Sequence, residues 1–286
     1  MKILVTGSNG QLGSELQLIA QHDNSSSYVF TDIQELDITS DVAVASFLAE
    51  SKPDIIINCA AYTAVDKAET DIRSAELVNF VAPTILSKAC LKSDIGLIHI
   101  STDYVFDGTA HLPYNEESDV NPTSVYGKSK LDGERAVLNA GGIVVRTSWL
   151  YSSHGNNFVK TMMRLGKEKE SIGVVFDQVG TPTWAYNLAE VLITIAKKST
   201  HDFKRFSGIY HYSNEGVCSW YDFAIEIMAL TNSPCKVSPI ETKEYPVPAP
   251  RPAYSVLNKR KIKDTFQIEI PHWKESLKKC VKLLSQ

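Results

Sequence analysis

A glycine-rich turn near the start of the chain limits its fold more than any other feature. Residues 7–13, GSNGQLG, directly follow the apolar run 3–6 and open a segment with helical spacing. The GxxGxxG spacing meets the needs of a pyrophosphate-binding turn: a tight bend, close backbone approach to the ligand and close helix–strand packing. A helix that begins there also directs N–H groups and the positive end of its dipole toward an anion. The chain therefore opens as a dinucleotide-binding unit.

The alternation of short apolar runs with longer amphipathic segments predicts an α/β fold. The runs are continuous, as in strands that are buried on both faces, and repeated strand–helix alternation is typical of a Rossmann-type, doubly wound parallel sheet. We expect strands at 3–6, 28–31, 54–59, 96–101, 142–147, 172–176 and 209–212. We expect helices at 12–21, 41–51, 72–92, 125–138, 157–169 and 185–198.

The alternation ends near residue 212, which predicts a smaller C-terminal substrate-binding lobe at the carboxyl edge of the sheet. Residues 218–230 have helical spacing, and six prolines then crowd residues 234–252. Pro271 is expected at the first position of a final helix over 272–284. We expect residues 1–150 to form the dinucleotide-binding core. Residues 151–215 would mix later strands with lobe insertions, and 216–286 would be mainly lobe.

Composition excludes several classes of protein. With 286 residues, 43% hydrophobic, the chain can bury a core without disulfides or a structural metal. A net charge of −4 does not indicate the excess of positive charge that nucleic-acid binding requires. No apolar run approaches the ~18 residues of a membrane span. The start MKILVTG resembles a strand rather than a signal peptide. Five widely spaced cysteines without a CxxC pair indicate free thiols in a reducing cytoplasm.

Acidic residues after the second predicted strand bear on the choice of coenzyme. Asp32 lies 19 residues after Gly13, where a carboxylate accepts hydrogen bonds from the adenosine ribose hydroxyls. No arginine stands beside it to receive a 2′-phosphate, which favours NADH. Asp32 could also be an exposed turn carboxylate. Asp37 and Ile38 could frame the adenine, or could belong to the start of the next helix.

A tyrosine and a lysine on one helix face are candidates for acid–base catalysis. Tyr126 and Lys130 are four residues apart, so they share a face. A neighbouring ammonium is expected to lower the pKa of the phenol and tune it for proton exchange with a carbonyl and alcohol pair. Thr102 ends the fourth predicted strand, at the edge where ligands bind in open α/β sheets. Its hydroxyl could hydrogen-bond the reacting oxygen beside Tyr126.

Together these motifs resemble the extended short-chain dehydrogenase/reductases and, more closely, the dTDP-4-dehydrorhamnose reductase family. The resemblance covers nearly the whole chain. Its motifs are residues 6–13, 58–66 (NCAAYTAVD), 101–106 (STDYVF), 126–130 (YGKSK), 146–149 (RTSW), 155–158 (GNNF), 177–178 with 181–183, and 251–252.

The resemblance implies reduction of the C4 keto group of dTDP-4-dehydro-β-L-rhamnose to dTDP-β-L-rhamnose, with NADH or NADPH oxidised. Tyr126 would protonate the C4 oxygen, Thr102 would orient the carbonyl, and Lys130 would bind the nicotinamide ribose. Together with the turn, the match gives these candidate coenzyme-binding residues: Gly7, Asn9, Gly10, Gln11, Leu12, Gly13, Asp32, Asp37, Ile38, Ala60, Ala61, Tyr62, Tyr126 and Lys130.

The sugar-nucleotide substrate needs its own contacts. Arg251, set between two prolines, could donate a bidentate pair of hydrogen bonds to a diphosphate. Tyr104, Trp149 and Trp184 could stack on the sugar and base, although each could equally be a core residue. Asn156 could hydrogen-bond a phosphate or a hydroxyl.

Some family members bind Mg²⁺ through glutamates at a dimer contact. Glu15 is present here, but residues 184–187 (WAYN) lack the acidic residue that other members carry. Metal-dependent dimerisation is therefore not expected, and a homodimer without metal stays open. His99 lies inside a predicted strand, where we expect it to be a packed structural residue.

Three other functions stay open at this point. A sugar-nucleotide 4,6-dehydratase usually has Asp-Glu after the threonine, whereas Asp103-Tyr104 stand here. An epimerase or another dehydrosugar reductase would use the same fold. A non-catalytic regulatory subunit, like the methionine adenosyltransferase β subunit, would bind nucleotide without oxidising it. Oxidation of the reduced coenzyme in the presence of the ketosugar separates the reductases from the binding protein.

Overall fold

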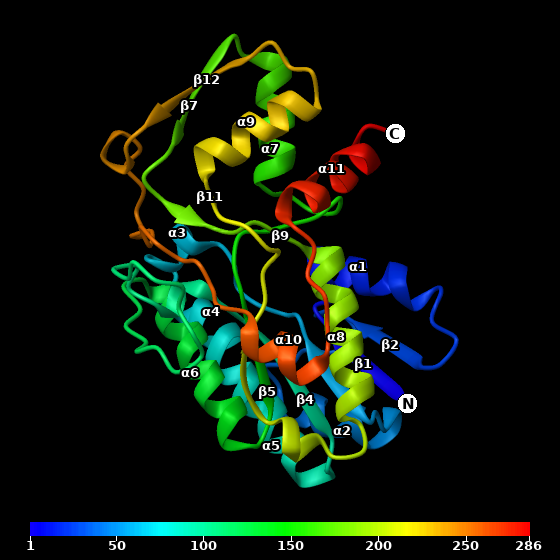
Figure 1. Cartoon of the computed structure of the whole chain (residues 1–286). Coiled ribbons are helices and arrows are strands. Elements are labelled where there is room, and N and C mark those ends of the chain that lie inside the picture. Colours follow the sequence, from blue (N-terminus) through cyan, green and yellow to red (C-terminus); the bar gives the residue numbers. More distant parts are fainter.

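Six parallel strands form the central sheet in a computed structural model that describes residues 1–286 (Figure 1). Their order is β10-β5-β4-β3-β1-β2, which confirms the predicted Rossmann-type sheet. β3 and β5 are buried along their whole length, because helices cover both faces of the sheet. The strands are β1 (Lys2–Thr6), β2 (Ser27–Thr31), β3 (Ile55–Asn58), β4 (Gly96–Thr102), β5 (Ile143–Thr147) and β10 (Gly208–His211).

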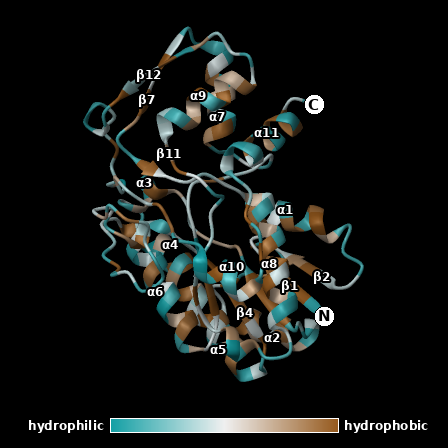
Figure 2. Cartoon of the chain, viewed as in Figure 1, coloured by the Kyte–Doolittle hydropathy of each residue, from teal (hydrophilic) through white to brown (hydrophobic).

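Two hydrophobic clusters, one on each face of the sheet, hold the helices in place. Ile3 and Val5 of β1 pack with α1 (Gln11–Ala20), α8 (Ala185–Ser199) and α10 (Arg260–Phe266). Leu4, between them, points to the other face and packs with α2 (Asp41–Ser51) and α5 (Ala82–Ser93). α6 (Val125–Asn139) lies beside α5 on this second face. Figure 2 shows the apolar residues concentrated on the sheet and on the helix faces turned toward it.

The helix expected over residues 72–92 forms over residues 72–93, but it is not a uniform α-helix. The chain forms α4 (Ile72–Glu76), a π-helical turn (Leu77–Val81) and then α5. Pro83 explains the π-helical turn, because it has no N–H to donate to the carbonyl of Asn79. The Asn79 side chain is buried and holds the neighbouring 60–62 loop.

A second, smaller layer of structure forms the lobe at the top of Figure 1. Its helices are α7 (Phe158–Glu168), α9 (Trp220–Leu230) and α11 (Trp273–Leu284), around a core of their own. β7 (Ser171–Val175) pairs in parallel with β12 (Lys236–Ile240) in this lobe. The prediction that residues 172–176 continue the main sheet is therefore wrong. A strand also runs through the proline-rich segment, which is tolerated because a two-stranded sheet leaves an unpaired edge for Pro239.

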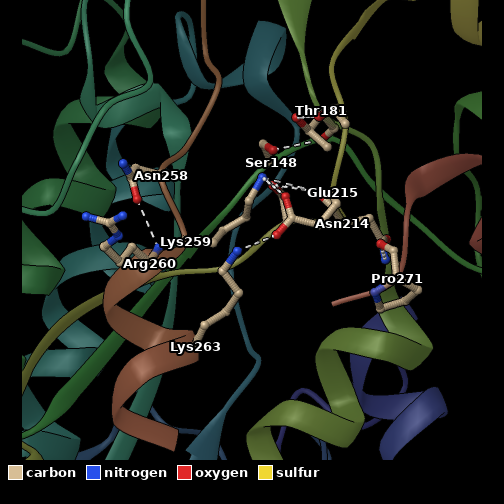
Figure 3. Close-up of polar contacts among 11 residues, drawn as sticks. Ser148, Thr181, Asn214, Glu215, Asn258, Lys259, Arg260, Lys263 and Pro271 are labelled. Atoms are coloured by element: carbon tan, nitrogen blue, oxygen red, sulfur yellow. Dashed lines mark hydrogen bonds and ion pairs between the residues drawn. The ribbon is translucent and has the colours of Figure 1, made fainter. Parts of the chain in front are cut away.

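Several short segments connect the lobe with the sheet domain. β6 (Leu150–Tyr151) pairs with β9 (Thr183–Trp184), and β8 (Val179–Gly180) pairs with β11 (Cys218–Ser219). Figure 3 shows the buried Lys259 near these connecting segments, and its ammonium lies 3.4 Å from the Glu215 carboxylate. Lys263 donates to the same carboxylate at 2.8 Å. These contacts tie the segment after β10 to the start of α10.

The last part of the chain contributes one helix to the sheet domain and one to the lobe. Ile262 and Phe266 of α10 pack in the core of the sheet domain, whereas Trp273 and Leu277 of α11 pack in the lobe. His272 caps α11 by accepting from the Lys274 N–H, so Pro271 precedes the cap. The predicted place of Pro271 in the first helical turn is therefore wrong. Short helical turns cover Val65–Ala68 (α3), Asp103–Val105, Phe203–Phe206 and Thr242–Glu244. None of the helices is long and apolar enough to cross a membrane.

Candidate active site

The glycine turn has the close packing that a dinucleotide site requires. Gly7 has φ +68°, and a Cβ there would lie 2.5 Å from the amide nitrogen of Ala60. A Cβ on Gly13 would lie 2.5 Å from the carbonyl oxygen of Gly7. Gly10 caps α1 without a side chain, so no side-chain oxygen occupies the first N–H groups of the helix. The turn therefore fits a bound pyrophosphate.

The other candidate coenzyme residues surround this turn. Asp32 directly follows β2 and accepts from the backbone N–H of Asn9 at 2.9 Å. It therefore stabilises the glycine turn beside which it is expected to bind the ribose. Gln11 accepts from the lobe residue Asn157 at 2.9 Å. Asp37 is exposed, and hydrogen bonds from Thr39 hold its pKa below the ordinary value.

Two of the apolar candidates face the protein core. Leu12 packs in the cluster beneath α1, and Ile38 packs in the cluster on the opposite face of the sheet. The loop 60–62 is fixed at both ends: Ala60 N–H donates to Asn58, and Tyr62 N–H donates to Asn79. These residues can therefore meet a coenzyme mainly through their backbone.

The catalytic candidates meet at the carboxyl end of β4. Ser124 caps α6 by accepting from the Gly127 N–H, which places Tyr126 and Lys130 in the first turns of the helix. Thr102 is the last residue of β4. The Tyr126 ring lies edge-on to the Tyr104 ring, with centroids 5.5 Å apart. The structure therefore brings Thr102, Tyr126 and Lys130 to one edge of the sheet, as their order in the sequence indicates.

The Tyr126 phenol differs from expectation in its pKa. Burial raises the pKa of Tyr126 to about 12, and the hydrogen bond with the Thr102 hydroxyl only partly offsets this rise. The expected lowering by Lys130 is wrong for the chain by itself, because the ammonium donates to the Ile100 carbonyl at 2.6 Å instead. The phenol therefore keeps its proton at neutral pH, which is the state that a proton donor needs.

Lys130 belongs to a buried polar chain that the sequence does not reveal. Its Nζ lies 3.3 Å from Nε2 of His99, and Nδ1 of His99 lies 3.0 Å from the Asn58 amide nitrogen. Asn58 Oδ1 accepts from Thr6 and from the Ala60 N–H, so its NH₂ faces the imidazole. His99 is buried, as predicted, and it also holds Lys130. Burial lowers the pKa of Lys130 to about 8 and holds that of His99 well below its usual value.

Asp103 is a buried carboxylate that sequence reasoning missed as a functional residue. It accepts a hydrogen bond from the Thr102 hydroxyl at 3.0 Å, and its Oδ2 has no partner. Burial raises the pKa of Asp103 to about 6. Its place directly after Thr102 was the available signal. Asp103 therefore controls the direction in which the Thr102 hydroxyl points.

A cleft of about 600 Å³ extends from Tyr104 toward the lobe. Arg251 lines it, with Nη2 2.8 Å from Oδ2 of Asp66 and Cζ 5.9 Å from the centroid of the Tyr104 ring. The other lining residues include the polar Asp66, Thr161 and Gln178 and these apolar lobe side chains: Phe158, Met162, Leu165, Ile172, Val174, Val175 and Trp220. One cleft therefore joins Tyr104, whose ring packs against Tyr126, with a cation and an apolar end.

The other substrate candidates lie in different surroundings. Trp149, at φ +48°, stacks on Trp220 with ring centroids 3.6 Å apart, so it supports the wall of the cleft. Trp184 is buried in the lobe core against Tyr186 and is not part of the lining. Asn156 is exposed and also lies outside the lining. The structure thus brings Tyr104 and Arg251 to the cleft and leaves Trp184 and Asn156 away from it.

No group of three or more His, Cys, Asp or Glu side chains is arranged to hold a metal ion. Glu15, which the family resemblance singles out, is buried and accepts from the Ser152 hydroxyl at 2.6 Å.

The glycine turn, the Thr–Tyr–Lys set and the adjoining cleft define a reductase of the extended short-chain dehydrogenase/reductase class. Comparison with known proteins agrees. The family model described as the RmlD substrate binding domain matches residues 1–286. The dTDP-4-dehydrorhamnose reductase of Aggregatibacter actinomycetemcomitans is 43% identical, with 97% of each chain covered. The chain therefore belongs to the dTDP-4-dehydrorhamnose reductase family.

Two solved structures of reductases with this name share the fold over almost their full length. That from Clostridium acetobutylicum superimposes with a TM-score of 0.94, at 46% identity and 100% coverage of both chains. That from Bacillus anthracis, solved in complex with NADP, gives a TM-score of 0.91 at 38% identity and 99% coverage of both chains.

Proposed function

We propose that this chain catalyses the NAD(P)H-dependent reduction of the C4 keto group of dTDP-4-dehydro-β-L-rhamnose. The product is dTDP-β-L-rhamnose, in the last step of its biosynthesis. The observation that carries the proposal is the single cleft that leads from Tyr104, beside the catalytic tyrosine, past Arg251 to an apolar end. A sugar, a diphosphate and a nucleoside occur in this same order along the substrate.

The coenzyme would be held by the turn 7–13, Asp32, the 60–62 loop and Lys130. When bound, the reduced nicotinamide supplies the hydride. The tight packing at Gly7 and Gly13 and the open N-terminus of α1 support this assignment. The Bacillus anthracis relative binds NADP, so both coenzymes stay within the proposal, and Asp32 favours NADH.

Each side chain of the site has a separate role in the proposed reaction. Tyr126 donates the proton to the C4 oxygen, because burial keeps its phenol protonated. Thr102 orients the carbonyl, and Lys130 holds the nicotinamide ribose beside Tyr126. Arg251 binds the diphosphate, and the apolar lobe side chains enclose the nucleoside.

A coupled assay tests the proposal directly. Upstream enzymes convert dTDP-glucose to the 4-keto substrate, the absorbance of the reduced coenzyme is followed, and NMR identifies the product. We expect oxidation of the coenzyme together with formation of dTDP-β-L-rhamnose. Absence of coenzyme oxidation would favour the regulatory-subunit alternative, and a product with a different configuration would indicate another dehydrosugar reductase.

We also place the chain in the cytoplasm. All five cysteines are free thiols, as is usual for proteins of a reducing compartment.

A further inference from the structure

We propose that Asp66 is a positioning residue that holds Arg251 across the cleft in the orientation that receives the substrate diphosphate. The inference rests on the proposed function, since it assumes that Arg251 binds this diphosphate. It adds a residue that acts on the substrate only through another side chain.

Asp66 connects the two units of the molecule. It lies on α3, in the sheet domain, and α3 is beside the orange segment that returns from the lobe in Figure 1. Its Oδ2 accepts from Arg251 Nη2 at 2.8 Å, and its Oδ1 accepts from the backbone N–H of Ala249 at 3.2 Å. One carboxylate therefore fixes both the guanidinium and the loop that carries it.

This ion pair leaves Arg251 with donors to spare. Asp66 contacts one guanidinium nitrogen only, whereas a bidentate pair would occupy two. Nη1 is buried and has no hydrogen-bond partner in the protein. Native structures rarely leave a buried donor unpaired without a reason, and a diphosphate oxygen would supply its partner.

Two opposite effects of Asp66 on substrate binding must be weighed. Its negative charge repels a diphosphate, but its side chain is 41% exposed, so solvent and salt screen this repulsion. Its hydrogen bonds immobilise a long, flexible side chain before the substrate arrives, which reduces the entropy that binding must remove. We therefore expect the favourable effect to be larger, and loss of Asp66 to weaken substrate binding.

The test uses steady-state kinetics of the full chain with the sugar nucleotide varied. We expect Asp66→Ala to raise the KM for the sugar nucleotide roughly 5- to 20-fold, with smaller changes in kcat and in the KM for the coenzyme. Asp66→Asn keeps an acceptor for Arg251 and should recover most of the loss. A KM in Asp66→Ala that is unchanged or lower, or no recovery in Asp66→Asn, would overturn the inference.

Asp132→Ala is a matched control. Asp132 is 45% exposed and pairs with Arg135 at 3.0 Å on α6, so the variant removes the same charge and a similar ion pair away from the cleft. Its KM should equal that of the wild type. An equal rise in both variants would mean that net charge, and not the position of Arg251, sets the KM.

A double-mutant cycle separates this inference from the function on which it rests. If Arg251→Ala leaves the KM unchanged, the assignment of Arg251 to the diphosphate is wrong. If Arg251→Ala raises the KM, we expect Asp66→Ala to add little in the double variant, because Asp66 then has no arginine to hold. Additive effects would show that Asp66 acts independently of Arg251 and would overturn the positioning role alone.

Discussion

The two ends of the cleft are built in different ways. At the catalytic end, Lys130 is 2% exposed, and it is held by β4 and α6 of a single domain. At the diphosphate end, Arg251 is 20% exposed and depends on an ion pair between two units of the molecule. In the proposed mechanism, regular elements would therefore position the catalytic residues, whereas contacts between units would position the residue that binds the substrate. Substitutions at the first end should change kcat, and substitutions at the second should change KM.

The largest expected effect tests the catalytic end. Tyr126→Phe keeps the ring and its edge-on packing with Tyr104 but removes the proton that the substrate oxygen receives. We expect kcat to fall on the order of 10²-fold or more, measured as coenzyme oxidation at saturating substrate. Turnover close to that of the wild type would remove Tyr126 from the mechanism. An unchanged circular-dichroism spectrum serves as the control for folding.

The next effect concerns the opposite end of the cleft. Arg251→Ala removes charge-assisted hydrogen bonds to the diphosphate, so the KM for the sugar nucleotide should rise roughly 10- to 100-fold. The Kd of the coenzyme should hardly change, because the proposed site of its pyrophosphate is separate, at Gly7–Gly13. Titration of each ligand separately measures both values. Weaker NADH binding with unchanged affinity for the sugar nucleotide would assign Arg251 to the coenzyme.

The sequence predicts arrangement best where it depends on local spacing. The turn at 7–13 and the pair Tyr126 and Lys130 are set by a few neighbouring residues on one strand or helix, so their arrangement could be predicted. The structure confirms the predicted parallel sheet. The sheet could be predicted because each of its strands is marked by its own apolar run.

The failures concern contacts between distant segments. The segment 171–175 has the composition of a sheet strand, and only its partner β12 places it in the lobe. Nothing near Asp66 in the sequence indicates that it meets a residue 185 positions later. The pKa of Tyr126 likewise depends on burial by several elements, which the spacing of two residues does not describe.

A smaller effect concerns the choice of coenzyme, which depends on Asp32 in the sheet domain. Asp32 carries a negative charge beside the turn and would repel the 2′-phosphate of NADPH while accepting from the free ribose hydroxyls of NADH. Asp32→Ala should shift the ratio of kcat/KM values toward NADPH by roughly tenfold. The wild type should use NADH at least as well as NADPH. A wild-type preference for NADPH of about tenfold would contradict this interpretation of Asp32.

The last expected effect is on stability, and it arises from the burial of a carboxylate at the catalytic end. The folded chain raises the pKa of Asp103 from 3.8 to about 6, because burial disfavours the charged form of the carboxyl group. Between these two values the folded state binds more protons than the unfolded state. The contribution of Asp103 to stability is therefore fully present below pH 3.8 and is lost as the pH rises past 6.

Asp103→Asn removes this titration while keeping an acceptor for the Thr102 hydroxyl. Relative to the wild type, the free energy of unfolding of the variant should improve by about 2 kcal/mol between pH ~4.5 and pH ~7.5. Urea unfolding at the two pH values measures the difference. A difference independent of pH would show that Asp103 has an ordinary pKa. In that case neither end of the cleft would contain a carboxylate whose protonation changes stability in this pH range.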